Sequence, residues 1–281
     1  MYETLVDPST LSEHRDDPEW VVIDCRNDLA AAGAGERAYV RAHIPGAFHT
    51  SLERVLTGKK SGRNGRHPLP EPERFARFLG QIGVGERTQV VAYDAGSDMY
   101  AARLWFLCRW VGHPAAAVLD GGYAAWSAGG YPVTAETSQA AQPGALRAPR
   151  ICHEMALDAG EVMARLHSER QLVLDARSPD RFAGQNETID PVAGHIPGAR
   201  NRWYKENYDG RGRMKTAERL RAEFAAAGVE APERVVHQCG SGISACVNLL
   251  AMEHAGLTAS RLYAGSWSEW IADPTRPVAR A

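Results

Sequence analysis

The chain has 281 residues, 44% of them hydrophobic and 23% charged, with a formal net charge of −2 at pH 7, so two domains of ordinary size are expected. This charge excludes a basic nucleic-acid-binding surface and a polybasic membrane patch. No apolar run is long enough to cross a bilayer and the N-terminus lacks a signal-peptide pattern, so we expect a cytoplasmic protein with a small-molecule partner.

The first half of the chain alternates short apolar strands with helical stretches. Its landmarks, in chain order, are VVIDCR at 21–26, AHIPGA at 42–47, QVVAYD at 89–94 and GGYAAW at 121–126. Alternation of strand and helix favours a parallel sheet with helices on both faces. The first half therefore predicts an α/β domain.

The second half repeats these landmarks in the same order. The corresponding segments are LVLDAR at 172–177, GHIPGA at 194–199, RVVHQC at 234–239 and GSWSEW at 265–270. Self-similar segments in a fixed order indicate a duplicated domain. Residues 136–150, rich in Ala, Gln, Thr and Pro, predict a linker between a first domain at 1–135 and a second at 151–281.

One cysteine of the second half stands in an unusual setting, the stretch VVHQCGSGISACVNLL at 235–250. A β-branched strand precedes Cys239 and a helical pattern begins near Ala245, so the loop between them is a strand-to-helix turn. The Gly-Ser-Gly that follows the cysteine offers little side chain for packing. Backbone N–H groups at a helix N-terminus favour a thiolate, which predicts that Cys239 is a nucleophile.

The other cysteines give no sign of cross-linking or metal binding. The chain has five in total, at 25, 108, 152, 239 and 246. An odd number without CxxC spacing or a companion histidine cluster indicates neither a disulfide framework nor a zinc site. Cys246 lies two helical turns beyond Cys239 and is interpreted as a core residue.

Aligning the two halves shows that they are not chemically equivalent. The position of Cys239 is occupied in the first half by Asp94, and the position of Arg181 by Ala30. Ser178 and Pro179 predict the start of a helix, with Arg181 in its first turn. The second half is therefore the expected reaction site.

Three other charged or titratable residues are interpreted as structural because they recur in both halves. Arg177 corresponds to Arg26, which indicates an ion pair that serves the fold. His43 and His195 both belong to HIPGA segments and recur whether or not the thiol is present.

These segments together resemble a tandem-domain rhodanese-type sulfurtransferase. The resemblance rests on the paired HIPGA segments, the CGSGIS loop, DARSPDRF, DGGYAAW and GSWSEW, and it covers nearly the whole chain. The loop is similar to the CG(S/T)GVT form of mercaptopyruvate sulfurtransferases, with Ile243 for Val and Ser244 for Thr. The resemblance implies a non-catalytic first domain, a catalytic second domain and an active site at the base of the cleft between them.

The resemblance also implies a mechanism without a metal or other cofactor. The Cys239 thiolate would attack the outer sulfur of a small anionic donor, and an acceptor would then discharge the resulting persulfide. Backbone N–H groups of the loop would stabilise both the thiolate and the persulfide. The implied substrate-binding residues are Arg181, Gly240, Ser241, Gly242, Ile243 and Ser244.

The charge of the loop bears on the sulfur donor. Thiosulfate-preferring relatives have basic residues after the cysteine, whereas this loop has Gly240 and Ser241. With Arg181 as the sole cation, the site suits the monocarboxylate 3-mercaptopyruvate, and thiosulfate is expected to be a secondary donor. A thiosulfate-preferring rhodanese stays the alternative. Cyanide, a small thiol and a thioredoxin-like protein all stay open as acceptors, as does the oligomeric state.

Two functions of other classes are less consistent with the sequence. A cysteine phosphatase or arsenate reductase needs an arginine six residues after its cysteine, where this chain has Ala245. A non-catalytic rhodanese-like binding module would lack the cysteine, as the first domain does.

Two features of the first half leave their roles open. Some family members place a first-domain histidine in a triad with a serine and an upstream aspartate. Here Ser241 and His43 are candidates, but no aspartate matches clearly. The segment GRHPLP at 65–70, with Arg66 and His67, predicts either a border of the cleft or a solvated loop.

Overall fold

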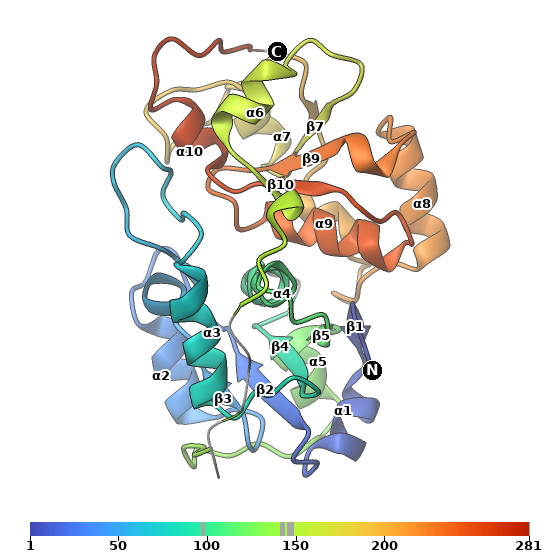
Figure 1. Ribbon diagram of the computed structural model, residues 1–281. Helices are drawn as coiled ribbons and strands as arrows, with labels where there is room; N and C mark the ends of the chain where they lie inside the picture. Colours follow the sequence, from blue (N-terminus) through green and yellow to red (C-terminus); the bar gives the residue numbers. More distant parts are fainter. Residues whose placement is uncertain (97–98, 141–143, 145–148, 281) are drawn as a thin grey trace. The chain divides into compact units, whose positions relative to one another are not determined.

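The computed structural model describes residues 1–96, 99–140, 144 and 149–280. The chain forms two compact units (Figure 1). Unit 1 comprises Met1–Gly58, Pro70–Cys152 and Gly210–Met214, and unit 2 comprises Lys59–Leu69, His153–Asp209 and Lys215–Ala281. Each unit thus contains one short segment whose neighbours in the chain belong to the other unit. The predicted linker includes residues 141–143 and 145–148, which lie outside the described residues.

Unit 1 is built on a five-stranded sheet in the order β1-β5-β4-β2-β3, with parallel pairing throughout. Its strands are β1 (Leu5–Val6), β2 (Trp20–Asp24), β3 (Phe48–His49), β4 (Gln89–Tyr93) and β5 (Ala116–Leu119). Its helices are α1 (Pro8–His14), α2 (Ala34–Arg41), the π-helix η1 (Leu52–Leu56), α3 (Pro72–Gln81), α4 (Tyr100–Trp110) and α5 (Gly122–Ala128).

Unit 2 repeats this plan, with a parallel sheet in the order β6-β10-β9-β7-β8. Its strands are β6 (Ala156–Leu157), β7 (Leu172–Asp175), β8 (Arg200–Asn201), β9 (Val235–Gln238) and β10 (Arg261–Tyr263). Its α-helices are α6 (Ala159–Ala164), α7 (Pro179–Ala183), α8 (Ala217–Ala226), α9 (Ala245–His254) and α10 (Ser266–Trp270), and its 3-10 helices are η2 (His153–Met155), η3 (Tyr204–Asn207) and η4 (Pro232–Arg234). The predicted pair of α/β domains, each with a parallel sheet, is confirmed.

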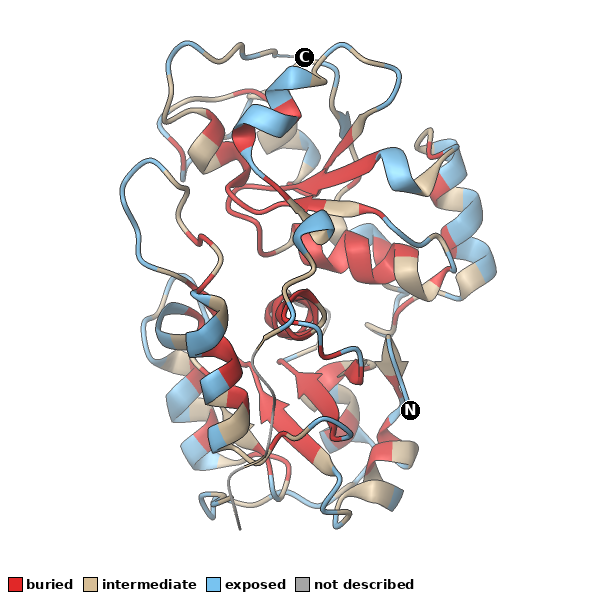
Figure 2. Ribbon diagram, viewed as in Figure 1, coloured by how far each residue is buried: buried red, intermediate tan, exposed pale blue. Residues whose placement is uncertain are grey.

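The central strands are buried on both faces (Figure 2). Every residue of β4 and of β9 is buried, which explains why β4 reads as the apolar run VVAY after Gln89 rather than as an alternating pattern, although β9 also buries the polar His237 and Gln238. The core on one side of each sheet includes a tryptophan from its last helix, Trp126 in unit 1 and Trp270 in unit 2. Their indole N–H groups donate to equivalent carbonyls, of Pro132 at 2.7 Å and Pro277 at 2.8 Å.

The two HIPGA histidines lie in matching structural positions. The Nδ1 atom of His43 is 2.7 Å from the Tyr39 carbonyl oxygen and its ring stacks on the Tyr39 ring. The Nδ1 atom of His195 is 2.9 Å from the Phe182 carbonyl oxygen, and its ring stacks on Phe182. These contacts with neighbouring backbone and rings favour a structural role for both histidines.

Strand β9 carries a buried histidine that links stability to pH. Burial lowers the pKa of His237 from 6.5 to about 3, and its Nε2 atom lies 3.1 Å from the Ser260 hydroxyl. Because the unfolded chain binds a proton below pH 6.5 and the folded chain does not until about pH 3, this contribution to stability is complete above pH 6.5 and is lost as the pH falls. At pH 5 the loss is about 2 kcal/mol.

Denaturant unfolding at pH 7.5 and pH 5 tests this expectation, with His237→Gln as the comparison. The wild type should lose about 2 kcal/mol more stability than the variant between these pH values. Equal losses would show that His237 does not carry the effect.

Among the described residues, no helix is long and apolar enough to span a membrane.

Candidate active site

Cys239 is the first residue after β9, and the loop 239–244 leads from that strand into α9. Its backbone is held by the start of α10: the Trp267 N–H donates to the Cys239 carbonyl oxygen and the Ser268 N–H donates to that of Gly240, both at 3.0 Å. The predicted strand-to-helix turn is thus confirmed, and a second helix anchors it. Cys239 itself is 2% exposed.

Ser266 holds the backbone of Cys239 through a hydrogen bond, and its own backbone conformation is strained. Its hydroxyl accepts a hydrogen bond from the Cys239 N–H at 3.1 Å and donates one to the Tyr263 carbonyl oxygen at 2.9 Å. The φ angle of Ser266 is +54°, where a non-glycine residue costs about 1 kcal/mol. The matching residue of unit 1 is Gly122, with φ +56°. Sequence comparison pairs these two positions, but only the geometry shows why a serine stands beside the thiol.

The loop presents a backbone donor to the sulfur atom. The Gly242 N–H donates to Cys239 Sγ at 3.1 Å. Gly242 has φ +78°, and a Cβ there would lie 2.2 Å from the Ala264 carbonyl oxygen, so only glycine fits. The structure therefore places one of the predicted N–H donors on the thiol; equivalent roles for Gly240, Ser241, Ile243 and Ser244 stay predictions.

The remaining cysteines lie in different surroundings. Cys246 is buried in α9 and its thiol contacts the Gly242 carbonyl oxygen at 3.4 Å, consistent with a core residue. Burial raises the pKa of Cys108 and of Cys25, and nearby Asp94 raises that of Cys25 further. These thiols are protonated under ordinary conditions and poor nucleophiles.

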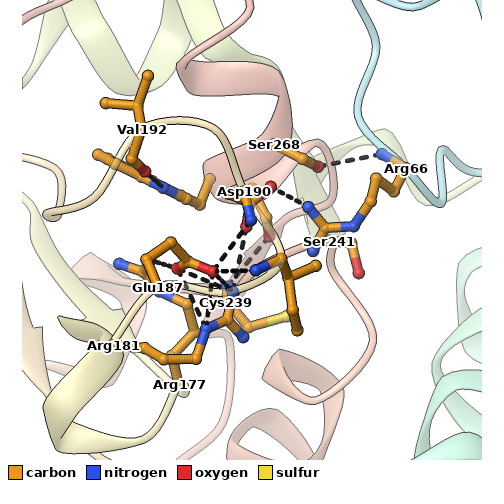
Figure 3. Close-up of polar contacts among 12 residues, drawn as sticks. Arg66, Arg177, Arg181, Glu187, Asp190, Val192, Cys239, Ser241 and Ser268 are labelled. Atoms are coloured by element: carbon orange, nitrogen blue, oxygen red, sulfur yellow. Dashed lines mark hydrogen bonds and ion pairs between the residues drawn. The ribbon is translucent and has the colours of Figure 1, made fainter. Parts of the chain in front are cut away.

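A chain of alternating charges runs beside the thiol (Figure 3). It begins at the carboxyl end of β7, which pairs with β9, so Asp175 and Arg177 meet Cys239 at the same sheet edge. Arg177 makes bidentate contacts with Asp175, including Nη2 to Oδ2 at 2.6 Å, and its Nη1 reaches Glu187 at 3.4 Å. All three side chains are at most 1% exposed. Burial disfavours the charged guanidinium, but the two carboxylates outweigh it and raise the pKa of Arg177.

Arg181 continues the chain from the predicted helix, α7, whose N-cap is Ser178 and whose first residue is Pro179. The Ser178 side chain makes no capping hydrogen bond. The guanidinium of Arg181 binds Glu187 through Nε and Nη2, at 3.1 and 2.9 Å, and Nη2 also reaches Asp190 at 3.1 Å. Sequence analysis missed both acids, although they stand together in the ETID segment at 187–190, between the arginine and GHIPGA.

The segment Lys59–Leu69 belongs to unit 2 and brings two further residues to the loop. Arg66 forms an ion pair with Asp190, and its backbone N–H donates to the Ser268 hydroxyl at 3.0 Å. A Cβ atom on Gly240 would lie 2.9 Å from Arg66 Nη2 and 3.5 Å from Arg181 Nη2. The interpretation of Arg181 as the sole cation was therefore wrong, because two guanidinium groups flank Gly240.

The histidine beside Ser241 is His67 rather than His43. His67 Nδ1 lies 2.8 Å from the Ser241 hydroxyl oxygen, and both residues are buried. The candidate pairing of Ser241 with His43, which the sequence left open, is thus wrong, and so is the solvated-loop alternative for GRHPLP. The signal was present in the sequence as a histidine next to two prolines, but local pattern alone does not show which unit the segment joins.

In unit 1 the equivalent loop holds a carboxylate where unit 2 has the thiol. The Asp94 side chain accepts hydrogen bonds from the N–H groups of Gly96, at 3.1 Å, and Ala101, at 3.0 Å. Asp94 is buried, and burial raises its pKa. Backbone N–H groups of unit 1 thus hold the Asp94 carboxyl group at the position that the Cys239 thiol has in unit 2.

Comparison with known proteins agrees with this architecture. The model of the rhodanese-like domain matches the chain twice, at residues 7–129 and 158–273. The chain therefore belongs to the rhodanese-like family, in a two-domain form.

Particular relatives are sulfurtransferases. The chain is 42% identical to a probable 3-mercaptopyruvate sulfurtransferase of Pseudomonas aeruginosa, over 98% of this chain and 97% of the relative. It is 30% identical to the thiosulfate sulfurtransferase of Bos taurus, over 96% and 93% of the two chains. The crystal structure of SseA from Escherichia coli, described as a 3-mercaptopyruvate sulfotransferase, has a TM-score of 0.80 at 31% identity, covering 95% of this chain and 99% of that chain.

Proposed function

We propose that the protein is a sulfurtransferase that moves sulfur from 3-mercaptopyruvate, and more slowly from thiosulfate, through a persulfide on Cys239 to a thiol or cyanide. The observation that carries this proposal is a buried cysteine with a backbone N–H on its sulfur and two arginines beside the next residue. The sequence similarity to sulfurtransferases over nearly the whole chain supports it.

The first half-reaction transfers sulfur to the enzyme. The Cys239 thiolate attacks the donor's sulfur, a sulfur–sulfur bond forms and the donor's carbon–sulfur bond breaks. The electron pair of that bond goes to the carbon, stabilised as an enolate, and the carbon takes up the proton that the donor thiol gives up. Pyruvate leaves, and the anionic persulfide stays on Cys239. The Gly242 N–H, which already contacts Sγ, helps to hold this negative charge.

The second half-reaction restores the enzyme. A thiolate or cyanide attacks the outer sulfur, takes it as a new persulfide or as thiocyanate, and leaves the Cys239 thiolate.

The first half-reaction also needs a proton transfer from the donor's sulfur to its carbon. The hydrogen-bonded pair of Ser241 and His67 is suited to relay this proton. Because the cycle needs a reduced cysteine, and the described cysteines are all free, we propose the cytoplasm as the place of action.

Mass spectrometry of the intact protein tests the persulfide. Treatment with 3-mercaptopyruvate should add the mass of one sulfur atom, and a later addition of cyanide should remove it. A protein whose mass does not change with either donor would refute the proposed function.

The donor preference has its own expected result. We expect kcat/KM for 3-mercaptopyruvate to exceed that for thiosulfate by about tenfold or more, because the charged side chains beside the loop contain as many acids as arginines and offer little to a dianion. The measurement uses both donors with one acceptor at matched pH and ionic strength. A wild type that prefers thiosulfate would overturn the donor assignment and leave the persulfide chemistry intact.

A further inference from the structure

The segment that leads to the thiol loop is strongly basic. Residues 59–66, KKSGRNGR, contain two lysines, two arginines and no acid, in a chain whose formal net charge is −2. We call these residues the basic segment. Its members Lys59, Lys60 and Arg63 are exposed, so the segment presents positive charge to the solvent.

Hydrogen bonds within the basic segment give its backbone a defined shape. The Asn64 side chain accepts a hydrogen bond from the Ser61 N–H at 2.8 Å and donates one to the Lys59 carbonyl oxygen at 3.0 Å. Gly62 has φ +80°, a conformation that favours glycine. Because the backbone that carries the exposed cations is already ordered, a partner that binds them has a smaller entropic cost to overcome.

The basic segment ends on the loop that holds the nucleophile. The Arg66 N–H donates to the Ser268 hydroxyl at 3.0 Å, and the Ser268 N–H donates to the Gly240 carbonyl oxygen at 3.0 Å. Arg63 precedes Arg66 by three residues, a stretch of chain that spans at most about 11 Å. A protein interface covers about 800 Å² on each partner. A protein that presents its cysteine to Cys239 is therefore large enough to cover the exposed cations as well.

Arg63 also lines a cavity just beyond α10. The cavity has a volume of about 380 Å³, and the residues that line it are Arg63, Ala272, Asp273, Pro274 and Arg276. Arg276 is held in place, because its Nη1 donates to the Glu269 carbonyl oxygen at 2.7 Å and its guanidinium lies over the Trp270 ring, 5.8 Å from the centroid. Two guanidinium groups against one acid suit the carboxylate of an aspartate or glutamate side chain.

We propose that the basic segment and this cavity form the docking surface for a protein sulfur acceptor that carries acidic residues beside its cysteine. The inference rests on the proposed function and names the chemical class of its acceptor. Arg63 and Arg276 bind one acidic side chain of the acceptor, and the exposed lysines attract the others. The acceptor's thiolate then attacks the outer sulfur of the persulfide. A sulfur–sulfur bond forms on the acceptor, and the electron pair of the broken bond stays on Cys239 as its thiolate.

Two synthetic peptides of equal length test the acceptor preference. One has aspartates on both sides of a single cysteine and the other has asparagines. Each is mixed with full-length protein that 3-mercaptopyruvate has loaded with sulfur, and the loss of one sulfur mass is followed in time. We expect the acidic peptide to discharge the wild type about tenfold faster per thiolate. This advantage should shrink when the ionic strength rises from about 50 to 500 mM.

Charge reversal shows whether the basic segment causes this preference. The double variant Lys59→Glu, Arg63→Glu should lose the preference for the acidic peptide and favour a peptide with lysines around its cysteine. Discharge by uncharged 2-mercaptoethanol should not change, because a small thiol needs no docking surface. Arg170→Glu is the matched control: this exposed arginine precedes β7, at the amino ends of the strands, whereas Cys239 follows the carboxyl end of β9. It should behave as the wild type.

Fluorescence anisotropy with the acidic peptide, its cysteine alkylated, supplies a readout that does not depend on sulfur transfer. The Kd should rise about tenfold in the double variant and stay unchanged in Arg170→Glu. Equal discharge by the acidic and asparagine peptides, an unchanged Kd in the double variant, or tighter binding of a single-stranded RNA oligonucleotide of the same charge would each overturn the inference. A wild type that gains no sulfur from either donor would contradict the proposed function instead, while the anisotropy still tests the docking surface.

Discussion

Replacing Cys239 with serine is expected to abolish sulfur transfer from either donor. A serine hydroxyl is far less acidic than a thiol and forms no stable persulfide, so neither half-reaction can proceed. The loop should keep its shape, because the Trp267 and Ser268 N–H groups donate to the backbone carbonyl oxygens of Cys239 and Gly240 and do not contact the sulfur. Turnover with 3-mercaptopyruvate and a thiol acceptor, together with the intact mass after donor treatment, measures the effect.

The other cysteines provide matched controls for this result. Serine variants at 25, 108, 152 and 246 should largely keep their turnover, because the proposed sulfur transfer passes through Cys239, whose loop directs the Gly242 N–H at its sulfur. Cys246→Ser is the sharpest control, since it lies in the helix that follows the same loop. Substantial turnover by Cys239→Ser would exclude a persulfide on this residue.

Arg177→Ala is expected to destabilise unit 2 by about 3–5 kcal/mol, which is the usual cost of leaving a buried charge without its partner. The variant would remove an ion-pair partner from Asp175 and from Glu187. Both side chains contact the guanidinium and are at most 1% exposed. It would also remove a cation from the Trp267 ring, 4.9 Å away. Denaturant unfolding of the full chain measures the loss.

The equivalent arginine of unit 1 is the control for that prediction. Arg26 pairs with Asp24 and contacts the Ala42 carbonyl oxygen, in the same way that Arg177 contacts Asp175 and Gly194. Arg26→Ala removes the ion-pair partner of one carboxylate rather than two, so the loss of stability should be smaller. If Arg177→Ala unfolds like the wild type but loses activity, the arginine serves catalysis rather than the fold.

The sequence is sufficient to predict the duplicated fold and the strand-to-helix turn that holds Cys239, for identifiable physical reasons. The buried strand β4 appears as the apolar run VVAY and β9 begins with two valines, and the break after Gln238 into small residues marks the turn that holds Cys239. The correspondence between Asp94 and Cys239 can also be predicted from the sequence, because each residue stands immediately after one of two matching strands, β4 and β9.

The rest of the site depends on contacts between residues far apart in the chain, which periodicity does not encode. His67 meets Ser241 across 174 positions, and Arg66 meets Asp190 across 124. The sequence left open whether His43 belongs with Ser241 for this reason: His43 and His67 both lie in the first half, and only the fold shows that Lys59–Leu69 joins unit 2. Ser266 was missed because its role follows from a backbone angle.

Each unit contains one short segment from the other half of the chain, so the boundary between the two sequence repeats differs from the boundary between the two structural units. A fragment that begins at His153 keeps the nucleophile, Arg181 and the acids that flank it, yet it omits the histidine next to Ser241 and the second guanidinium above Gly240. The first half of the chain therefore supplies residues that contact the Cys239 loop, through a segment inserted between its own helices η1 and α3. Truncation at the repeat boundary would separate the thiol from these partners, so the second repeat alone does not contain every residue that packs around the Cys239 loop.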